Sequence, residues 1–404
     1  MAFGRILSGW LAVLSLVACS AVSTDPQKAT IDDLPLVALS DEQVANLTQL
    51  EGDAIDAVIG RRYGDAEVLA NQVLDTNPRS ARARAVLGMV KLQIASQDPP
   101  GDWLGLRAGE VEMELARQLD PDSAFVGWMH AVFLAESGHM SAAASAAEDA
   151  LARSEGSPPS ERSALLGTAG TFRYELGEER AARRHLAAYV ALRPDDSAAH
   201  FRLGSSLLSI ANTPQGSPPP YSRSQATAES AAKAFQRCYV LAPGDEDAAL
   251  AIATAWIRAA ELADLQTKSD TAAKRAGKRT ECEALYEKAA NHLREVAQKF
   301  PANAEVHFCL GVLATAQKQT GVARASYLAA LDRDKGHVGS LLNLATLMVT
   351  ENEVSQASVL FGRLLAIPAL QTDLTSKERD RIARWLRDNA APEPAAGAGS
   401  VNGS

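Results

Sequence analysis

The sequence has few aromatic residues and lacks an excess of basic ones. Aromatic side chains make up 5% of its 404 residues, whereas apolar residues make up 47%. Runs of β-branched and aromatic residues are scarce and alanine is abundant, so the composition favours closely packed helices over sheets. The formal net charge is −9, from 40 basic and 49 acidic residues. Because phosphate binding needs a concentrated basic surface, nucleic acid is not expected as a partner.

Cysteine pairs and catalytic motifs are also missing. The four cysteines are Cys19, Cys238, Cys282 and Cys309, and none belongs to a CxxC pair. This spacing indicates neither a zinc site nor a redox pair; the last three cysteines are interpreted as buried free thiols, among which at most one disulfide could form. The seven histidines show no ligand spacing, and GxSxG, HExxH, GxGxxG and GxxxxGK[ST] are absent. We therefore expect no enzymatic activity, metal, cofactor or small-molecule substrate.

Residues 1–18 have the features of a secretory signal. A single arginine, Arg5, precedes a largely apolar stretch that is too short to span a bilayer as a mature helix. The stretch ends with Leu-Val-Ala-Cys at 16–19, which resembles the bacterial lipobox. That resemblance implies cleavage before Cys19 and its lipidation. With serine at position 20, it also implies an outer-membrane lipoprotein facing the periplasm. An ordinary secretion signal followed by a coincidental cysteine is the alternative.

Residues 19–39 are polar, contain two prolines and are expected to form a tether. Regular structure is expected from Ser40, because Gln43 three residues later completes a capping-box pattern. This tether would connect a membrane anchor to the folded part of the chain.

The C-terminal end divides into two segments. Thr375 and Glu378 form a second capping-box pattern, and apolar residues after them fall on one helical face. This pattern predicts a capping helix within residues 372–389, of the kind that covers the last apolar face of a repeat array. Residues 390–404 are rich in alanine, proline, glycine and serine and are expected to be disordered.

Between these ends, residues 40–371 contain a repeated pattern. A small residue stands ten positions after each of five prolines. The pairs are Pro78 with Gly88, Pro121 with Ala131, Pro194 with Gly204, Pro243 with Ala253, and Pro301 with Gly311. The pattern resembles the tetratricopeptide repeat (TPR), a helix–turn–helix unit of about 34 residues. The clearest unit is Ala304–His337, in which Gly311 and Ala323 stand where the two helices touch.

The resemblance implies an all-α fold: a right-handed superhelix, or α-solenoid, of about eight units with a C-terminal capping helix. Three units carry insertions between their helices, at Ser96–Leu106, Asn212–Gln225 and about Leu262–Arg279. The basic part of the third, Thr267–Arg279, could contact lipid headgroups or an acidic partner. A solvated helix face is the alternative.

The resemblance also implies where a partner binds. In this family, positions 2, 5, 9 and 12 of each first helix line a concave groove. The apolar residues at these positions are Phe125, Trp128, Val132, Tyr174, Phe201, Leu208, Leu250, Ile257, Phe308, Val312, Leu342 and Val349. Such a row suits an extended or helical apolar segment of another protein, although the same side chains could instead be core. Arg202 and Asn343 stand alone at possible carboxylate-clamp positions, so no clamp is expected.

Together these features predict a non-catalytic scaffold or adaptor. It would be lipid-anchored in the bacterial cell envelope, would face the periplasm, and would bind other envelope proteins through the groove. One alternative is a regulator of a cell-wall or polysaccharide-export enzyme, which also acts by binding. Another is an enzyme with an unrecognised site, but no segment outside the repeats is longer than the tether or the tail.

Overall fold

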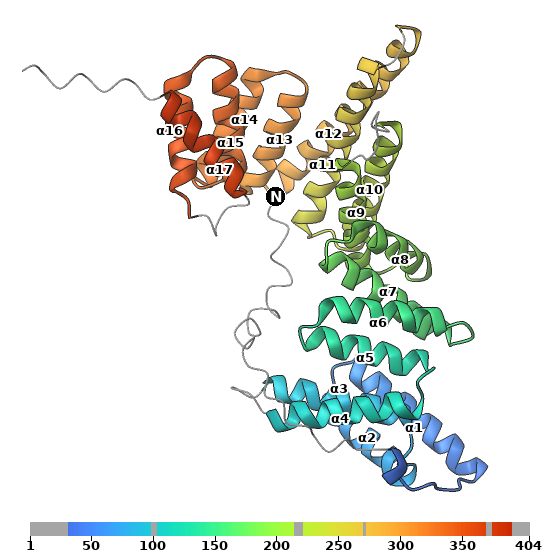
Figure 1. Cartoon of the computed structure of the whole chain (residues 1–404). Helices are drawn as coiled ribbons and strands as arrows, with labels where there is room; N and C mark the ends of the chain where they lie inside the picture. The colour runs from blue at the N-terminus through green and yellow to red at the C-terminus, as the bar shows by residue number, and fades with distance from the viewer. Residues whose placement is uncertain (1–30, 98–102, 214–220, 270–271, 369–373, 390–404) are drawn as a thin grey trace, which may run out of the picture. The chain divides into compact units, whose positions relative to one another are not determined.

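The computed structural model describes residues 31–97, 103–213, 221–269, 272–368 and 374–389. Over these ranges the chain forms seventeen α-helices and one 3-10 helix, with no strand. Seven successive helix pairs pack closely along the chain, two further helices stand between the fourth and fifth of these pairs, and a single helix ends the series (Figure 1). The predicted all-α architecture of about eight helix–turn–helix repeats with a capping helix is confirmed.

The helices fall into two compact units that divide inside α9, at Leu207. The helices of the N-terminal unit are η1 (Ile31–Asp33), α1 (Asp41–Ile59), α2 (Tyr63–Thr76), α3 (Ala81–Gln97), α4 (Trp103–Leu119), α5 (Ala124–Glu136), α6 (Met140–Arg153), α7 (Pro159–Glu175) and α8 (Glu179–Leu192). Helix α9 (Ser197–Asn212) contains the boundary. The helices of the C-terminal unit are α10 (Tyr221–Leu241), α11 (Glu246–Ser269), α12 (Ala272–Lys299), α13 (Ala304–Ala316), α14 (Thr320–Arg333), α15 (Val338–Thr350), α16 (Val354–Ala366) and α17 (Ser376–Asp388).

Both predicted capping boxes are present, and each fixes the start of a helix. At α1, the Ser40 N–H donates to Gln43 Oε1 at 2.9 Å and the Gln43 N–H donates to Ser40 Oγ at 3.3 Å. At α17, the Thr375 N–H donates to Glu378 Oε2 at 2.8 Å and the Glu378 N–H donates to Thr375 Oγ1 at 3.2 Å. These bonds satisfy backbone donors that have no partner inside the helix.

Small residues lie where the two helices of a pair touch. A Cβ placed on Gly170 of α7 would be 2.8 Å from Leu186 Cγ of α8. A Cβ on Gly311 of α13 would collide with the Tyr327 ring of α14, which is buried. The alanines at equivalent positions, Ala131 and Ala345, are fully buried. The small residues in the repeat pattern therefore set how closely paired helices approach.

The last part of the predicted tether, residues 31–39, contacts the first repeats. Residues Ile31–Asp33 form the 3-10 helix η1. The Arg79 guanidinium, in the turn before α3, donates to the carbonyl oxygens of Ile31 at 2.8 Å and Leu34 at 3.0 Å. Leu39 packs against the apolar core of the first repeats. A long-range side-chain contact therefore holds this segment, and a local polar composition does not reveal such a contact.

The third predicted insertion does not form a loop, because most of it continues the two helices that it separates. Helix α11 runs on to Ser269 and α12 starts at Ala272, so this pair is longer than its neighbours (Figure 1). Alanine, lysine and glutamate, which are strong helix formers, are common along α12, and no proline interrupts it. Among the described helices, none is long and apolar enough to cross a membrane.

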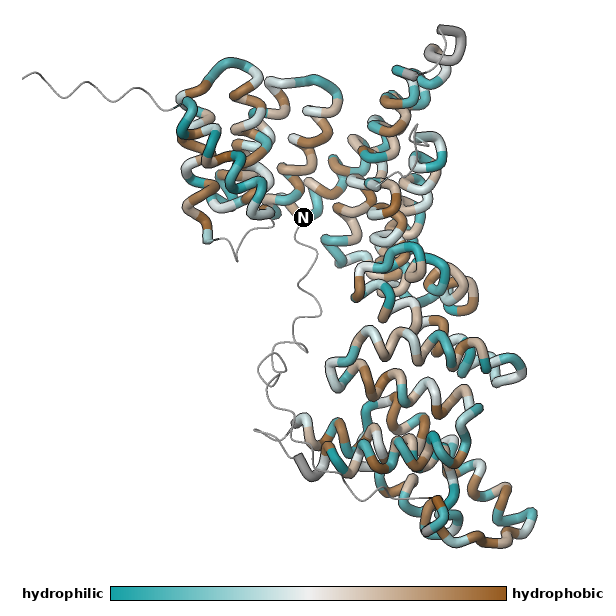
Figure 2. Tube along the Cα trace, viewed as in Figure 1, coloured by the Kyte–Doolittle hydropathy of each residue, from teal (hydrophilic) through white to brown (hydrophobic). Residues whose placement is uncertain are grey.

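Helix α17 covers the end of the array as predicted. Its buried residue Ile382 joins the core formed by α14, α15 and α16, and the Trp385 ring packs edge-on against Phe361 with centroids 5.0 Å apart. The Arg379 guanidinium donates to the Leu365 and Ile367 carbonyl oxygens at 2.8 and 3.2 Å, near the end of α16. The rest of α17 is hydrophilic, in contrast to the apolar α13 (Figure 2).

Candidate functional site

The structure divides the predicted groove residues into half-buried and buried sets. The half-buried residues are Trp128, Val132, Tyr174, Phe201, Leu208, Phe308, Val312, Leu342 and Val349. Phe125, Leu250 and Ile257 are only 1%, 4% and 4% exposed. The expectation that these three line an open groove is wrong, because they belong to the packed interior.

Physical causes of this burial are visible around Phe125 and α11. The Arg82 guanidinium lies 4.3 Å from the centroid of the Phe125 ring, and Trp128 packs edge-on against the ring with centroids 6.0 Å apart. Helix α11 is enclosed because α10, α12 and α13 pack against it. Leu250 and Ile257 are therefore unavailable to a partner.

The first helices of the third, fourth and fifth repeats line a pocket of about 310 Å³, which we call the α5–α9 pocket. It lies within the N-terminal unit. The lining side chains that matter here are Trp128 and Val132 of α5, Thr168 and Phe172 of α7, Tyr189 of α8, and Arg202 of α9. The pocket therefore contains two of the predicted groove residues, Trp128 and Val132.

Trp128 is held as a fixed wall of the pocket. Its indole Nε1–H donates to Thr168 Oγ1 at 2.9 Å, so the polar edge of the ring is satisfied by α7. The ring also packs edge-on against Phe125 of the same helix and against the core residues Ala150 and Leu165. An indole with a bonded N–H and a packed edge presents an apolar face in one orientation, which lowers the entropy cost of binding against it.

Tyr189 of α8 is a second aromatic residue in the pocket lining. Its hydroxyl donates to Asp196 Oδ2 at 2.9 Å, and Asp196 Oδ1 accepts the Ala199 N–H at 2.9 Å in the first turn of α9. Burial, and then the bond to Asp196, raise the pKa of Tyr189 to about 12, so the phenol stays neutral. A Cβ on Gly167 would be 3.0 Å from the Tyr189 ring, so the ring needs a glycine opposite it.

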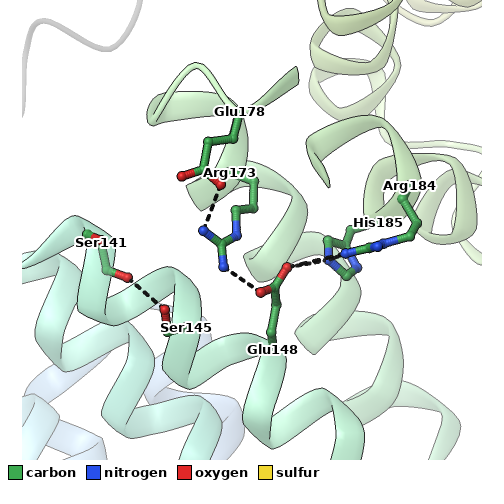
Figure 3. A network of polar contacts seen from close by, with 7 residues as sticks. All are labelled: Ser141, Ser145, Glu148, Arg173, Glu178, Arg184 and His185. Atoms are coloured by element: carbon green, nitrogen blue, oxygen red, sulfur yellow. Dashed lines mark hydrogen bonds and ion pairs between the residues drawn. The ribbon is translucent and has the colours of Figure 1, made fainter. Parts of the chain in front are cut away.

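A polar network joins α6, α7 and α8 (Figure 3). The Arg173 guanidinium of α7 donates to Glu148 of α6 at 2.5 Å and to Glu178 at 2.7 Å. His185 Nε2 of α8 lies 2.8 Å from the other Glu148 oxygen. The Arg173 hydrogen bond lowers the pKa of Glu148, so the carboxylate stays ionised at neutral pH. One carboxylate thus ties together three helices from two repeats.

In the C-terminal unit, Phe308 contacts the next repeat. Its ring centroid lies 5.1 Å from that of His337 and 6.1 Å from that of Tyr327. A Cβ on Gly339, in the first turn of α15, would be 2.8 Å from Phe308 Cε2. Much of this predicted groove residue therefore packs between α13 and α15.

Sequence analysis missed Thr168 and Tyr189, because neither occupies a groove position of the repeat. Tyr189 stands where the repeat pattern usually has alanine, and Gly167 lies opposite it. A large residue at an alanine position, with a glycine on the neighbouring helix, is the sequence signal for this contact. The signal can be interpreted only when the packing of the two helices is known. The polar partner of Trp128 had no signature in the sequence.

The remaining cysteines agree with the sequence interpretation. Cys238, Cys282 and Cys309 are buried free thiols. Burial raises the pKa of Cys282 to about 11 and that of Cys309 to about 12, so both are protonated at neutral pH. Over the part of the chain that the structure describes, no group of three or more histidine, cysteine or acidic side chains could hold a metal ion. Cys19 and the first 30 residues lie outside the described residues.

Several solved structures are similar to this chain at low identity. MamA from Desulfovibrio magneticus RS-1 is 16% identical, with 52% of this chain and 97% of that chain covered and a TM-score of 0.36. PilF of Pseudomonas aeruginosa is 15% identical, with 66% and 97% covered and a TM-score of 0.41. YrrB, a TPR protein, is 15% identical, with 57% and 96% covered and a TM-score of 0.40. At these values we draw no functional argument from the likeness.

No curated protein matches the sequence. The family profile described as tetratricopeptide repeat matches residues 285–338, which run from within α12 through α13 and α14 to the start of α15. This segment includes the unit in which Gly311 meets Tyr327. The matched residues belong to a tetratricopeptide repeat, and the helices before and after them continue the same helix–turn–helix architecture.

Proposed function

We propose that this chain is a non-catalytic scaffold that binds another protein of the bacterial cell envelope through the faces of its first helices. The observation that carries this proposal is the α5–α9 pocket, which has an apolar wall fixed by a hydrogen bond. Apolar pockets with rigid aromatic walls are where protein partners place their anchoring side chains. The half-buried residues of α13 and α15 would extend the contact surface within the C-terminal unit.

The proposal includes a lipid anchor at Cys19, with the folded part of the chain facing the periplasm. Its support is the lipobox-like run at 16–19 and the polar segment that follows. Because Arg79 holds the chain at Ile31, the twelve residue steps from Cys19 to Ile31 set the reach of the anchor at about 40 Å. An anchor of this reach would keep the first repeats close to the membrane surface.

Site-specific photo-crosslinking in cells tests the binding surface. A photoreactive residue is placed at Val132 in the N-terminal unit or at Val349 in the C-terminal unit, both half-buried groove positions. Matched controls carry it at Arg183 of α8 and Gln356 of α16, which are exposed on second helices. We expect one envelope protein to be captured from the groove positions only. Equal capture from the control positions, or no capture from either groove position, would contradict the proposal.

The anchor is tested separately. Mass spectrometry of the mature N-terminus should find an acylated Cys19, and Cys19→Ala should leave the precursor uncleaved by the lipoprotein peptidase. A first residue that carries no lipid would rule out the anchor while leaving the binding surface unaffected. The identity of the cross-linked protein then separates an assembly scaffold from a regulator of a cell-wall or polysaccharide-export enzyme.

A further inference from the structure

The first and last α-helices of the array carry opposite charge. Helix α1 holds five acidic residues and no basic one. Helix α17 holds five basic and three acidic residues, although the chain as a whole has a net charge of −9. A basic helix at one end of an acidic chain, and an acidic helix at the other, make the two ends electrostatically complementary.

The basic side chains of α17 point away from the array. Ile382 joins the core on the inner side of this helix, where α16 packs against it. The exposed basic residues are Lys377, Arg381, Arg384 and Arg387. Lys377 and Arg384 are seven residues apart, so they lie on one face of the helix, opposite Ile382. We call this face the basic end face.

The acidic residues of α17 reduce the charge of the basic end face without cancelling it. Glu378 is engaged by the capping box, where it accepts from the Thr375 N–H and hydroxyl, both at 2.8 Å. Asp380 and Asp388 are exposed, but over the described residues neither forms a salt bridge with a basic side chain of α17. The Arg384 Nε–H instead donates to the Asp380 backbone oxygen at 3.4 Å. The arginines and the lysine therefore remain accessible to carboxylates of another molecule.

The outer face of α1 is acidic and open. Helices α2 and α3 pack against α1 on the side of Leu47, which is buried. The exposed acidic residues are Asp41, Glu42, Asp53 and Asp56. Asp56 lies opposite Leu47 on the helix, and a Cβ on the nearby Gly52 would meet nothing within 4 Å. We call this outer face the acidic end face.

The basic residues nearest to α1 in sequence do not neutralise the acidic end face. Arg61 and Arg62 follow the last turn of the helix, and Arg62 pairs with Asp65 at 3.2 Å. Residues 40–65 together hold six acidic and two basic residues. Two acidic end faces would repel each other, as would two basic ones, so the favourable contact joins unlike end faces.

We propose that this chain associates with a second copy of itself end to end, with the basic end face of one copy against the acidic end face of the next. Such a contact is heterologous, so each dimer keeps one end face of each kind and can add further copies. This inference goes beyond the proposed function, because it uses the ends of the array and leaves the α5–α9 pocket accessible. Exposed ion pairs are individually weak, so the association is weak and sensitive to salt.

Sedimentation velocity of the full chain in a neutral detergent tests the proposal. In about 0.01 M salt, the average mass should rise with protein concentration. In about 1 M salt the Debye length falls from about 30 Å to about 3 Å, so the mass should stay that of one chain. Every variant carries the same N-terminal segment, so association through detergent or lipid is the same for all of them.

Charge reversals locate the contact. Lys377→Glu with Arg384→Glu reverses the basic end face, and Asp53→Lys with Asp56→Lys reverses the acidic one. Each pair of substitutions should weaken self-association at least about tenfold, because the contact then joins like charges. Mixing the two variants, or combining all four substitutions in one chain, should restore association. This restoration also shows that the variants fold.

The matched control reverses as many charges elsewhere. Arg180→Glu with Arg183→Glu changes two exposed arginines of α8, which lie outside both end faces. This variant has the same net charge as Lys377→Glu with Arg384→Glu. It should associate as wild type does, because only the position of the charge differs.

The other outcomes overturn the proposal. A wild-type chain that stays monomeric in low salt has no such contact; if it then binds phosphatidylglycerol vesicles through Lys377 and Arg384, the basic end face is a lipid contact instead. Loss of association without restoration in the mixture means that the end faces do not meet each other. A mass of one chain, with a sedimentation coefficient that changes on charge reversal, means that they meet within one copy. Cross-links from Val132 or Val349 test the proposed function independently of all these results.

Discussion

The groove positions of α5 and those of α11 behave differently, although the repeat pattern treats them as equivalent. On α5, Trp128 and Val132 are half-buried and line a pocket. On α11, Leu250 and Ile257 are both 4% exposed and belong to the core. Groove positions therefore line a pocket on α5, apart from the buried Phe125, and are part of the packed core on α11.

The neighbours of each helix explain this difference. Beside α5, the α7 residues Ala164 and Gly167 that line the pocket are small. The Trp128 indole is hydrogen-bonded to Thr168 of the same helix α7. Helix α11 belongs to the longest helix pair, and α10, α12 and α13 pack along it. A position in a repeat specifies the direction of a side chain, and the sizes of the adjacent side chains decide whether space remains above it.

The largest expected effect is the difference in stability cost between a truncation on α11 and one on α5. Ile257→Ala should lower the free energy of unfolding by about 2–5 kcal/mol, the usual cost of removing a large aliphatic side chain from a core. Val132→Ala should cost about 1 kcal/mol, because that side chain is already partly solvated. Denaturant unfolding measures both, and amide hydrogen exchange reports which repeats open. Equal costs would mean that α5 and α11 do not differ in the way described.

A second substitution tests the contact inside a helix pair. Gly311→Leu should cost about 1–3 kcal/mol, because the added side chain must displace the buried Tyr327 ring. Tyr327 is also fixed by a hydrogen bond of 2.8 Å to Thr315, so it cannot rotate away freely. Gly321→Leu is the matched control: a Cβ at Gly321, in the same pair, meets nothing within 4 Å. A thermal midpoint of Gly311→Leu equal to that of the control would reject the assigned repeat register.

These contacts show which features were predictable from the sequence. The helix pairs and both capping boxes follow from local spacing, because caps and close approaches need particular residues a fixed number of positions apart. Gly311 could be assigned to a helix contact for that reason. Such features recur along the chain, so units that match the pattern at many positions support the assignment of units that match it at few.

The pocket and the held N-terminal segment were not predictable in the same way. Trp128 is oriented by Thr168, forty residues along the chain, and Ile31 is held by Arg79, forty-eight residues along. Neither bond has a local signature, since each depends on the helices being packed first. The burial of Leu250 and Ile257 likewise depends on how closely other helices surround α11.

A pH-dependent effect is expected on the other side of α5. Burial, with a smaller contribution from Arg117 and against the opposing effect of Glu114, lowers the pKa of His130 to about 4. Glu110 and His139 line the same cavity of about 220 Å³. Between about pH 6.5 and pH 4, the unfolded chain holds a proton at His130 that the folded chain does not hold. Stability should therefore fall as the pH falls through this window.

The loss should be about 1–2 kcal/mol between pH 7 and pH 5, and His130→Gln should reduce it. An NMR titration should give the His130 ring a pKa well below that of an ordinary histidine. A ring that titrates near pH 6.5, together with identical profiles for wild type and His130→Gln, would contradict the effect.

The smallest expected effect concerns the bond that orients the pocket wall. Thr168→Val keeps the volume of the side chain and removes the acceptor of the Trp128 indole N–H. The cost should be about 0.5–1.5 kcal/mol of stability, the net value of one hydrogen bond whose donor is left partly buried. Thr346→Val on α15 is the matched control: the Thr346 hydroxyl is exposed and bonds to the Leu342 carbonyl of its own helix. If Thr168→Val and Thr346→Val have the same stability, the bond to Thr168 does not hold Trp128 in place. The contrast between the α5 and α11 faces would then depend on side-chain volume alone.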